Sequence, residues 1–257
     1  MEAVFKLNGN IAETRKWAAG PWNANQQHGS APSSLIAHTV EHMPSPQPMR
    51  VARLTIDLMR PVPVAPLEIK TEILREGRKI QLIGVQLLAN GVEVVRATVL
   101  KVRALDIDLP AAVEAKRVTV PFPREDAPPA MPNGSNPFIT GLSVQEARGG
   151  FRIPGPAAVW FRADRPLIEG VPTSPLMRAV VTSDFCNGTA SVLDFNKFTF
   201  INADLTISLS RMPVGEWILL DAESWIGENG AGVAFAGLAD EQGYFGRAVQ
   251  TLVIEPR

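Results

Sequence analysis

The two halves of this 257-residue chain follow one hydrophobic pattern at a constant separation of 151 residues. Residues 54–56 and 205–207 both read Leu-Thr-Ile. At the same separation, three further matches are Leu58 with Leu209, Arg60 with Arg211, and Arg96-Ala97 with Arg247-Ala248. The alternation of apolar and polar residues stays in phase from residue 54 to residue 97, without a gap. Such self-similarity indicates two copies of one structural unit.

Each copy has the pattern of one helix followed by several strands. Period-two alternation predicts strands over 53–58, 67–74, 80–88 and 92–102, and again over 204–209, 217–226, 231–239 and 244–254. Helical spacing after serine and proline residues predicts helices over 33–43 and 174–185. One helix and an antiparallel sheet, twice over, is an α+β arrangement. A long helix wrapped by such a sheet is a hotdog, so we expect a double hotdog.

Proline marks the boundary between the copies. The segment 121–137 is too rich in proline for a helix or a central strand. We therefore predict an N-terminal hotdog unit at 1–105, a Pro-rich connection at 106–148, and a C-terminal unit at 149–257 that carries the catalytic residues.

Composition excludes several classes of function. Lys and Arg number 25 against 26 Asp and Glu, which gives no electrostatic footprint for nucleic acid or an anionic membrane. The single cysteine, Cys186, excludes an intrachain disulfide and fits a buried apolar position. No signal peptide or membrane-spanning run is apparent, so we expect a cytoplasmic protein. His38 and His42 lack a third ligand, and we predict no metal and no cofactor.

Two positions break the internal symmetry. Asp204 stands where the first copy has Arg53, and Gln250 stands where it has Val99. A carboxylate can deprotonate a water and an amide can orient it, so the two side chains could converge on one water. Asp204 alternates with apolar neighbours, however, and a solvated sheet face explains it equally well.

Several segments in both halves carry a family resemblance, which covers roughly residues 17–103 and 157–254. They are 20–29 (GPWNANQQHG), 53–63 (RLTIDLMRPVP), 174–176 (SPL), 182–185 (TSDF), 211–217 (RMPVGEW) and 246–250 (GRAVQ). In order and spacing the chain resembles the acyl-CoA thioesterase II family, in its double-hotdog branch. The resemblance implies hydrolysis of a small-molecule acyl-CoA to a free acid and CoA. It also implies that an Asp, a Gln and a Ser or Thr of the second unit hold the water.

Carried over by position, the resemblance assigns catalytic roles to Asp204, seven residues before Arg211, and to Gln250. Ser224 is the only hydroxyl at the expected place of the third residue, and a shift of one position would turn it to the other face. Should Asp204 prove dispensable, Asp184 or Glu223 is the next candidate.

The segment ahead of the first helix is the predicted substrate-binding site. Backbone N–H groups of His28, Gly29 and Ser30 could polarise the thioester carbonyl, since a helix N-terminus favours negative charge. Glycine lets a substrate approach the backbone, although a plain turn would use it too. We expect His28 to be structural or at the pocket mouth, and not a base.

Three alternatives remain open. A hotdog hydratase or dehydratase needs a His paired with a carboxylate, but Leu209 occupies the position five residues after Asp204, and the second half has no His. A non-catalytic acyl-CoA or acyl-carrier binding protein would explain the missing Thr. A scaffolding protein gains no support from the sequence. A double hotdog already pairs two units, so both a monomer and a homo-oligomer built on edge strands are compatible with it.

Overall fold

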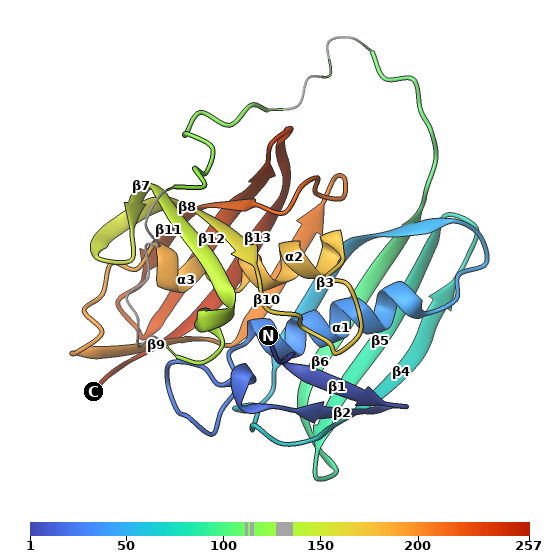
Figure 1. The fold of residues 1–257 in the computed structure, drawn as a ribbon, viewed down its shortest axis with the longest axis horizontal. Helices are drawn as coiled ribbons and strands as arrows, with labels where there is room; N and C mark the ends of the chain where they lie inside the picture. The colour runs from blue at the N-terminus through green and yellow to red at the C-terminus, as the bar shows by residue number, and fades with distance from the viewer. Residues whose placement is uncertain (111–112, 114–115, 127–135) are drawn as a thin grey trace.

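The structure is a computed structural model that describes residues 1–110, 113, 116–126 and 136–257. Its described strands form one antiparallel sheet of thirteen strands that runs through both halves of the chain (Figure 1). The order across the sheet is β1-β2-β4-β5-β6-β3-β10-β13-β12-β11-β8-β7, and β9 pairs with β13 off this path. Strands β3 and β10 are neighbours, so the halves are joined by hydrogen bonds as well as by packing.

The first half contains six strands and the helix α1. Their bounds are β1 Phe5–Asn8, β2 Ile11–Thr14, α1 Ser30–His42, β3 Met49–Leu58, β4 Leu67–Glu76, β5 Ile80–Ala89 and β6 Val92–Arg103. The second half contains the other seven strands and two helices. Their bounds are β7 Leu142–Gly150, β8 Ile153–Ala163, α2 Pro175–Ser183, α3 Cys186–Thr189, β9 Phe198–Asn202, β10 Asp204–Leu209, β11 Ile218–Ile226, β12 Ala231–Asp240 and β13 Gly243–Pro256. Short 3-10 turns lie at Lys16–Ala18 and Ile139–Gly141.

The strand bounds follow the internal repeat. Strand β5 at 80–89 corresponds residue for residue, at the separation of 151, to β12 at 231–240. The two copies also pair with each other, because Thr55 lies opposite its own equivalent, Thr206. Leu54 and Ile56 lie opposite Ile207 and Leu205. Because equivalent residues pair in antiparallel fashion, a local two-fold axis passes through the Thr55–Thr206 pair. Both strands therefore direct their leucines and isoleucines to the same face of the sheet.

The helices pack side by side on that apolar face (Figure 1). Leu35 and Ile36 of α1, Val180 of α2, and Leu54 and Ile207 of the joining strands all belong to one buried cluster. The two halves therefore share a single hydrophobic core. None of the described helices is long and apolar enough to span a lipid bilayer.

The two helices differ in length, which corrects the expectation of a long helix in each half. Helix α1 has 13 residues, whereas α2 has 9 and ends at Ser183. The Ser174 hydroxyl caps α2 by accepting the N–H of Met177. At the other end, Phe185 N–H bonds to the Thr182 carbonyl, a tight i to i−3 bond that closes the helix. Asp184 is thus the C-cap residue of the helix.

Described residues of the predicted connection 106–148 pack against strands of the second half. Strand β7, Leu142–Gly150, occupies its last residues. Further back, Val118 and Val120 pack beside Trp160, whose indole N–H donates to the carbonyl of Pro121 at 2.8 Å. The division at residues 105 and 148 stays a prediction, since sheet and core both continue across the two halves.

Candidate active site

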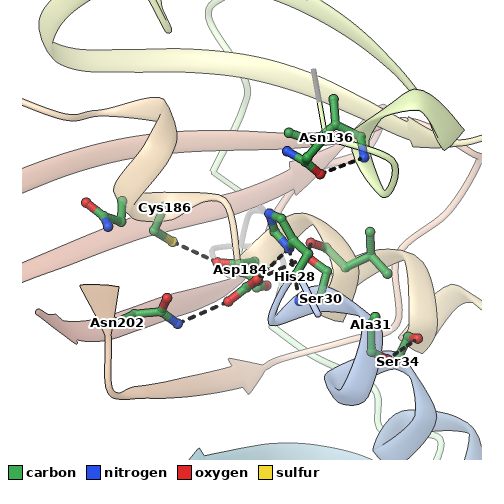
Figure 2. Close-up of polar contacts among 12 residues, drawn as sticks. His28, Ser30, Ala31, Ser34, Asn136, Asp184, Cys186 and Asn202 are labelled. Carbon is green, nitrogen blue, oxygen red and sulfur yellow. Dashed lines mark hydrogen bonds and ion pairs between the residues drawn. The ribbon is translucent and has the colours of Figure 1, made fainter. Parts of the chain in front are cut away.

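The carboxylate of Asp184 is the centre of a buried polar cluster (Figure 2). Its Oδ1 accepts hydrogen bonds from Asn202 Nδ2 at 3.1 Å and from Gln250 Nε2 at 3.2 Å. Its Oδ2 lies 2.9 Å from His28 Nδ1 and 3.2 Å from Ser30 Oγ. A buried carboxylate is costly unless donors surround it, and here both oxygens have donors.

These residues come from both halves of the chain. His28 and Ser30 stand at the N-terminal end of α1 in the first half. Asp184 follows α2, Asn202 ends β9, and Gln250 lies on β13, all in the second half. Ser30 Oγ also lies 2.9 Å from the Val181 carbonyl oxygen. Its one hydroxyl proton is therefore shared between that carbonyl of α2 and the Asp184 carboxylate. The packing of α1 against α2 therefore assembles the cluster.

Gln250 is held in one orientation. Its side chain is fully buried, and its Oε1 accepts the N–H of Asn187 at 3.1 Å. Its Nε2 donates to the Asp184 carbonyl oxygen at 3.1 Å as well as to the carboxylate. Because acceptor and donor ends both have partners, the amide cannot flip without losing bonds. The carboxylate beside Gln250 is that of Asp184, whereas the sequence analysis expected Gln250 to share a water with Asp204.

Asp204 lies on the opposite face of the sheet. On β10, Leu205 and Ile207 point into the core, so Asp204 points outward, where its Oδ1 accepts the N–H of Thr251 at 2.6 Å. Gln250 is an inward residue of β13. The predicted convergence of Asp204 and Gln250 on one water is therefore corrected, because strand alternation directs the two side chains to different faces.

Ser224 also lies away from the cluster. It faces inward on β11, opposite Ala234, which in turn lies opposite Gln250. Two strand spacings, or about 10 Å, therefore separate Ser224 from Gln250. Within the part of the chain that the structure describes, the Ser224 hydroxyl has no hydrogen-bond partner. Besides Gln250, the second half contributes the side-chain amide of Asn202 to the carboxylate.

The sequence reasoning overlooked Asn202 and ranked Asp184 second. Asn202 stands where the first copy has Val51, the same asymmetry that singled out Gln250. Asp184 lies in the segment 182–185, one of the segments that carry the family resemblance. The sequence therefore marks both Asn202 and Asp184. It contains no local pattern, however, that shows that α2 ends at Ser183 and that Asp184 faces β13.

A cavity of about 420 Å³ opens beside this cluster. Asp184, Asn202, His28 and Gly29 contribute to its lining. Much of its remaining wall is apolar and includes Trp22, Leu58, Val62, Phe195, Ile201 and Val253. Among the described residues, no hydrogen-bond partner is found for the Gly29 N–H. An apolar cavity that ends in a few convergent polar groups is the usual form of a small-molecule site.

Metal ligands do not gather in the described part of the chain, where no group of three or more His, Cys, Asp or Glu is placed to hold an ion. The rings of His38 and His42 lie 4.1 Å apart on α1. Burial, and to a lesser extent His42, lowers the pKa of His38. A pair without further ligands is ordinary helix packing.

Two family models match the sequence: the acyl-CoA thioesterase N-terminal domain over residues 18–102 and the acyl-CoA thioesterase C-terminal domain over residues 118–254. The chain belongs to the acyl-CoA thioesterase family. Both halves of this family member contribute to the cluster around Asp184. No curated protein sequence matches the chain.

Solved structures show that this acyl-CoA thioesterase family member has a hotdog fold. A conserved protein with a hot dog fold from Alicyclobacillus acidocaldarius is similar with a TM-score of 0.78 and 15% identity, over 98% of this chain and 95% of that one. An acyl-CoA thioesterase II from Mycobacterium marinum is similar with a TM-score of 0.69 and 16% identity, over 98% and 95% of the two chains.

Proposed function

We propose that this protein is a double-hotdog hydrolase that converts acyl-CoA thioesters to free carboxylic acid and CoA by direct attack of water. The observation that carries the proposal is the Asp184 carboxylate, bonded to Gln250 and Asn202 at the end of an apolar cavity. The family resemblance implies an Asp, a Gln and a hydroxyl residue of the second half. In this proposal Asp184 replaces Asp204, and Asn202 replaces the hydroxyl that Ser224 was expected to supply.

In the proposed reaction, Asp184 accepts a proton from a water in the cavity, while Gln250 and Asn202 hold its carboxylate in place. The water oxygen bonds to the thioester carbon, whose carbonyl oxygen takes up the negative charge. The N–H of Gly29, at the positive end of α1, stabilises that charge. Collapse of the tetrahedral intermediate breaks the carbon–sulfur bond, and the departing CoA thiolate takes the proton from Asp184. No covalent acyl-enzyme forms.

Release of CoA thiol from a panel of short to long acyl-CoAs tests this proposal, with Asp184→Asn and Asp204→Asn as a matched pair. Loss of a general base should lower kcat of Asp184→Asn by about a hundredfold or more. Asp204→Asn should stay within about threefold of wild type, because its side chain lies on the outer face. Equal activity of wild type and Asp184→Asn would remove Asp184 from the mechanism.

Hydration of an enoyl-CoA is a second candidate function, and the pairing of His28 with Asp184 favours it. The absence of His from the second half argued against a hydratase, but the first half supplies one. Hydration adds water across the carbon–carbon double bond and leaves the thioester intact. Loss of the enoyl thioester absorbance without thiol release would therefore favour this candidate over hydrolysis.

A non-catalytic acyl-CoA or acyl-carrier binding protein is the outcome if wild type binds acyl-CoA but changes none of these substrates. Calorimetric titration with an acyl-CoA, beside the thiol assay, separates binding from turnover. We further propose that the protein works without a cofactor, in the cytoplasm. A chain-length series of substrates would assign the acyl group, and sedimentation would distinguish a monomer from a homo-oligomer.

A further inference from the structure

We infer that His28 is a positioning residue of the proposed hydrolysis, which holds the Asp184 carboxylate in place from the other half of the chain. The inference rests on the proposed function and assigns to His28 a role that the sequence analysis did not. It is carried by the hydrogen bond between the two side chains and by the aromatic rings that hold the imidazole.

The surroundings of Nδ1 decide which nitrogen carries the proton, because both a carboxylate and an N–H group approach it. His28 Nδ1 lies 2.9 Å from Asp184 Oδ2, and the side chains are 10% and 4% exposed. Ser30 N–H lies 3.2 Å from the same nitrogen. If Nδ1 carried no proton, its lone pair would face a buried carboxylate and repel it. If Nδ1 carries the proton, the Ser30 N–H loses an acceptor but remains at the positive end of α1, which costs less. Nδ1–H therefore donates to Oδ2, a charge-assisted hydrogen bond.

Two phenylalanine rings clamp the imidazole. Phe138 stacks on one side with centroids 5.0 Å apart and planes 15° apart, and Phe185 stacks at 4.6 Å and 29°. Phe138 is itself fixed, because its N–H donates to the carbonyl of Ala19. Phe185 stacks in turn on Phe161 at 4.8 Å. The ring of His28 has little freedom to rotate, so its hydrogen bond fixes the direction of Asp184.

The consequence for Asp184 follows from its two oxygens. Asn202 and Gln250 hold Oδ1, whereas Oδ2 relies on His28 and on a Ser30 hydroxyl that is shared with a carbonyl. Without the His28 donor, the buried Oδ2 would keep only the shared Ser30 hydroxyl as a donor. The carboxylate would then rotate toward another hydrogen-bond donor. The first half thus completes the site that the second half provides.

A pair of variants separates the hydrogen bond from the stacking. In His28→Asn, the amide Nδ2 has the same number of bonds to the backbone as Nδ1, so a donor toward Asp184 is kept while the ring is lost. In His28→Phe, the ring between Phe138 and Phe185 is kept while the donor is lost. Thermal unfolding of both variants, each at wild-type concentration, controls for loss of fold.

We expect His28→Phe to lower kcat for acyl-CoA hydrolysis by about 10- to 100-fold, with KM within about threefold of wild type, as is typical when a group that orients a catalytic side chain is removed. His28→Asn should retain most of the wild-type kcat. Equal loss in both variants, or no loss in either, would overturn the inference while the proposed function stands. A wild type that releases no thiol from any acyl-CoA would overturn both.

The proton itself provides a readout that does not need turnover. The protein has three histidines, so the imidazole N–H resonances can be assigned by single substitutions. His28 Nδ1–H should give a low-field proton resonance that exchanges slowly with water, since it is buried and bonded to a carboxylate. That resonance should vanish in Asp184→Asn and persist in Asp204→Asn. Its absence from the wild type would contradict the hydrogen bond.

Discussion

A Cβ atom on Gly29 would lie 2.8 Å from both carboxylate oxygens of Asp184. Gly29 has φ −58°, a conformation that any residue adopts, so the glycine is needed for space and not for backbone freedom. The first half of the chain thus leaves room for the central carboxylate of the second half. The sequence analysis expected a glycine here for access of a substrate, and the structure adds the access of Asp184.

Gly29→Ala should therefore fold and lose activity. The added methyl group would displace Asp184 from Gln250, and a displacement of about 1 Å lowers a catalysed rate on the order of a hundredfold. Gly77→Ala is the control, because a Cβ there would meet only Ile80 O at 3.4 Å. Thiol release and thermal unfolding of both variants check the prediction. A fully active Gly29→Ala would show that the position of Asp184 does not matter.

Asn202→Asp should inactivate the site, whereas Asn202→Thr should not. Asn202 donates to Asp184 Oδ1, and a second carboxylate there would face the first at about 3 Å, so that the two would share a proton. The hydroxyl of threonine can still donate, as the family resemblance implies. We expect kcat at pH 7 to fall at least about tenfold in Asn202→Asp only, the lower end of the effect of impaired acid–base catalysis. Kinetics of both variants at pH 7 check this, and similar rates would contradict it.

Asp240 should stabilise the fold above acidic pH. Burial alone would raise its pKa, but hydrogen bonds from Arg211 and from the N–H groups of Val214 and Gln242 outweigh burial and lower the pKa. A pKa that is lower in the folded state adds stability above the unfolded value, about 3.9, and this stability is lost as the pH falls through the folded pKa. Asp240→Asn should cost about 3 kcal/mol at pH 7 and less near pH 3.

Urea unfolding at both pH values checks the prediction for Asp240. The matched control is Asp126→Asn, because the ion pair of Asp126 with Arg124 is exposed on both sides and should contribute little. A cost for Asp240→Asn that stayed constant down to pH 3 would show that its carboxylate does not titrate with folding.

Cys186 should not react with the disulfide reagent that is used to detect CoA thiol. It is the single cysteine of the chain, and burial, together with the nearby charge of Asp184, raises the pKa of its thiol. A thiol that stays protonated and has no access to solvent does not react with a disulfide reagent. The native protein should therefore release no colour without acyl-CoA, and one equivalent should appear in urea. Rapid reaction of the native protein would place Cys186 at the surface.

Much of the sheet follows directly from the sequence. The repeat at 151 residues predicts which strands correspond, and β5 and β12 match it residue for residue. Strands β1, β2, β7, β8 and β9 were missed because they are short or irregular, or, like β8 with its continuous buried run, carry little alternation. Similarly, helix periodicity predicts α1 and α2 within a few residues but does not show where α2 ends.

The site divides in the same way. The asymmetry of the repeat points to Gln250, and the resemblance points to the proposed reaction, because both depend on single positions along the chain. The partner of Gln250 is a property of space. Asp204 lies close to the position that pairs with Gln250, yet alternation turns it outward, whereas Asp184 lies 66 residues away and reaches Gln250 because α2 stops at Ser183. His28 reaches the same carboxylate across 156 residues of chain only because α1 packs against α2. Sequence patterns determine faces and elements, since these depend on neighbours along the chain, and the packing of distant elements decides which side chains meet.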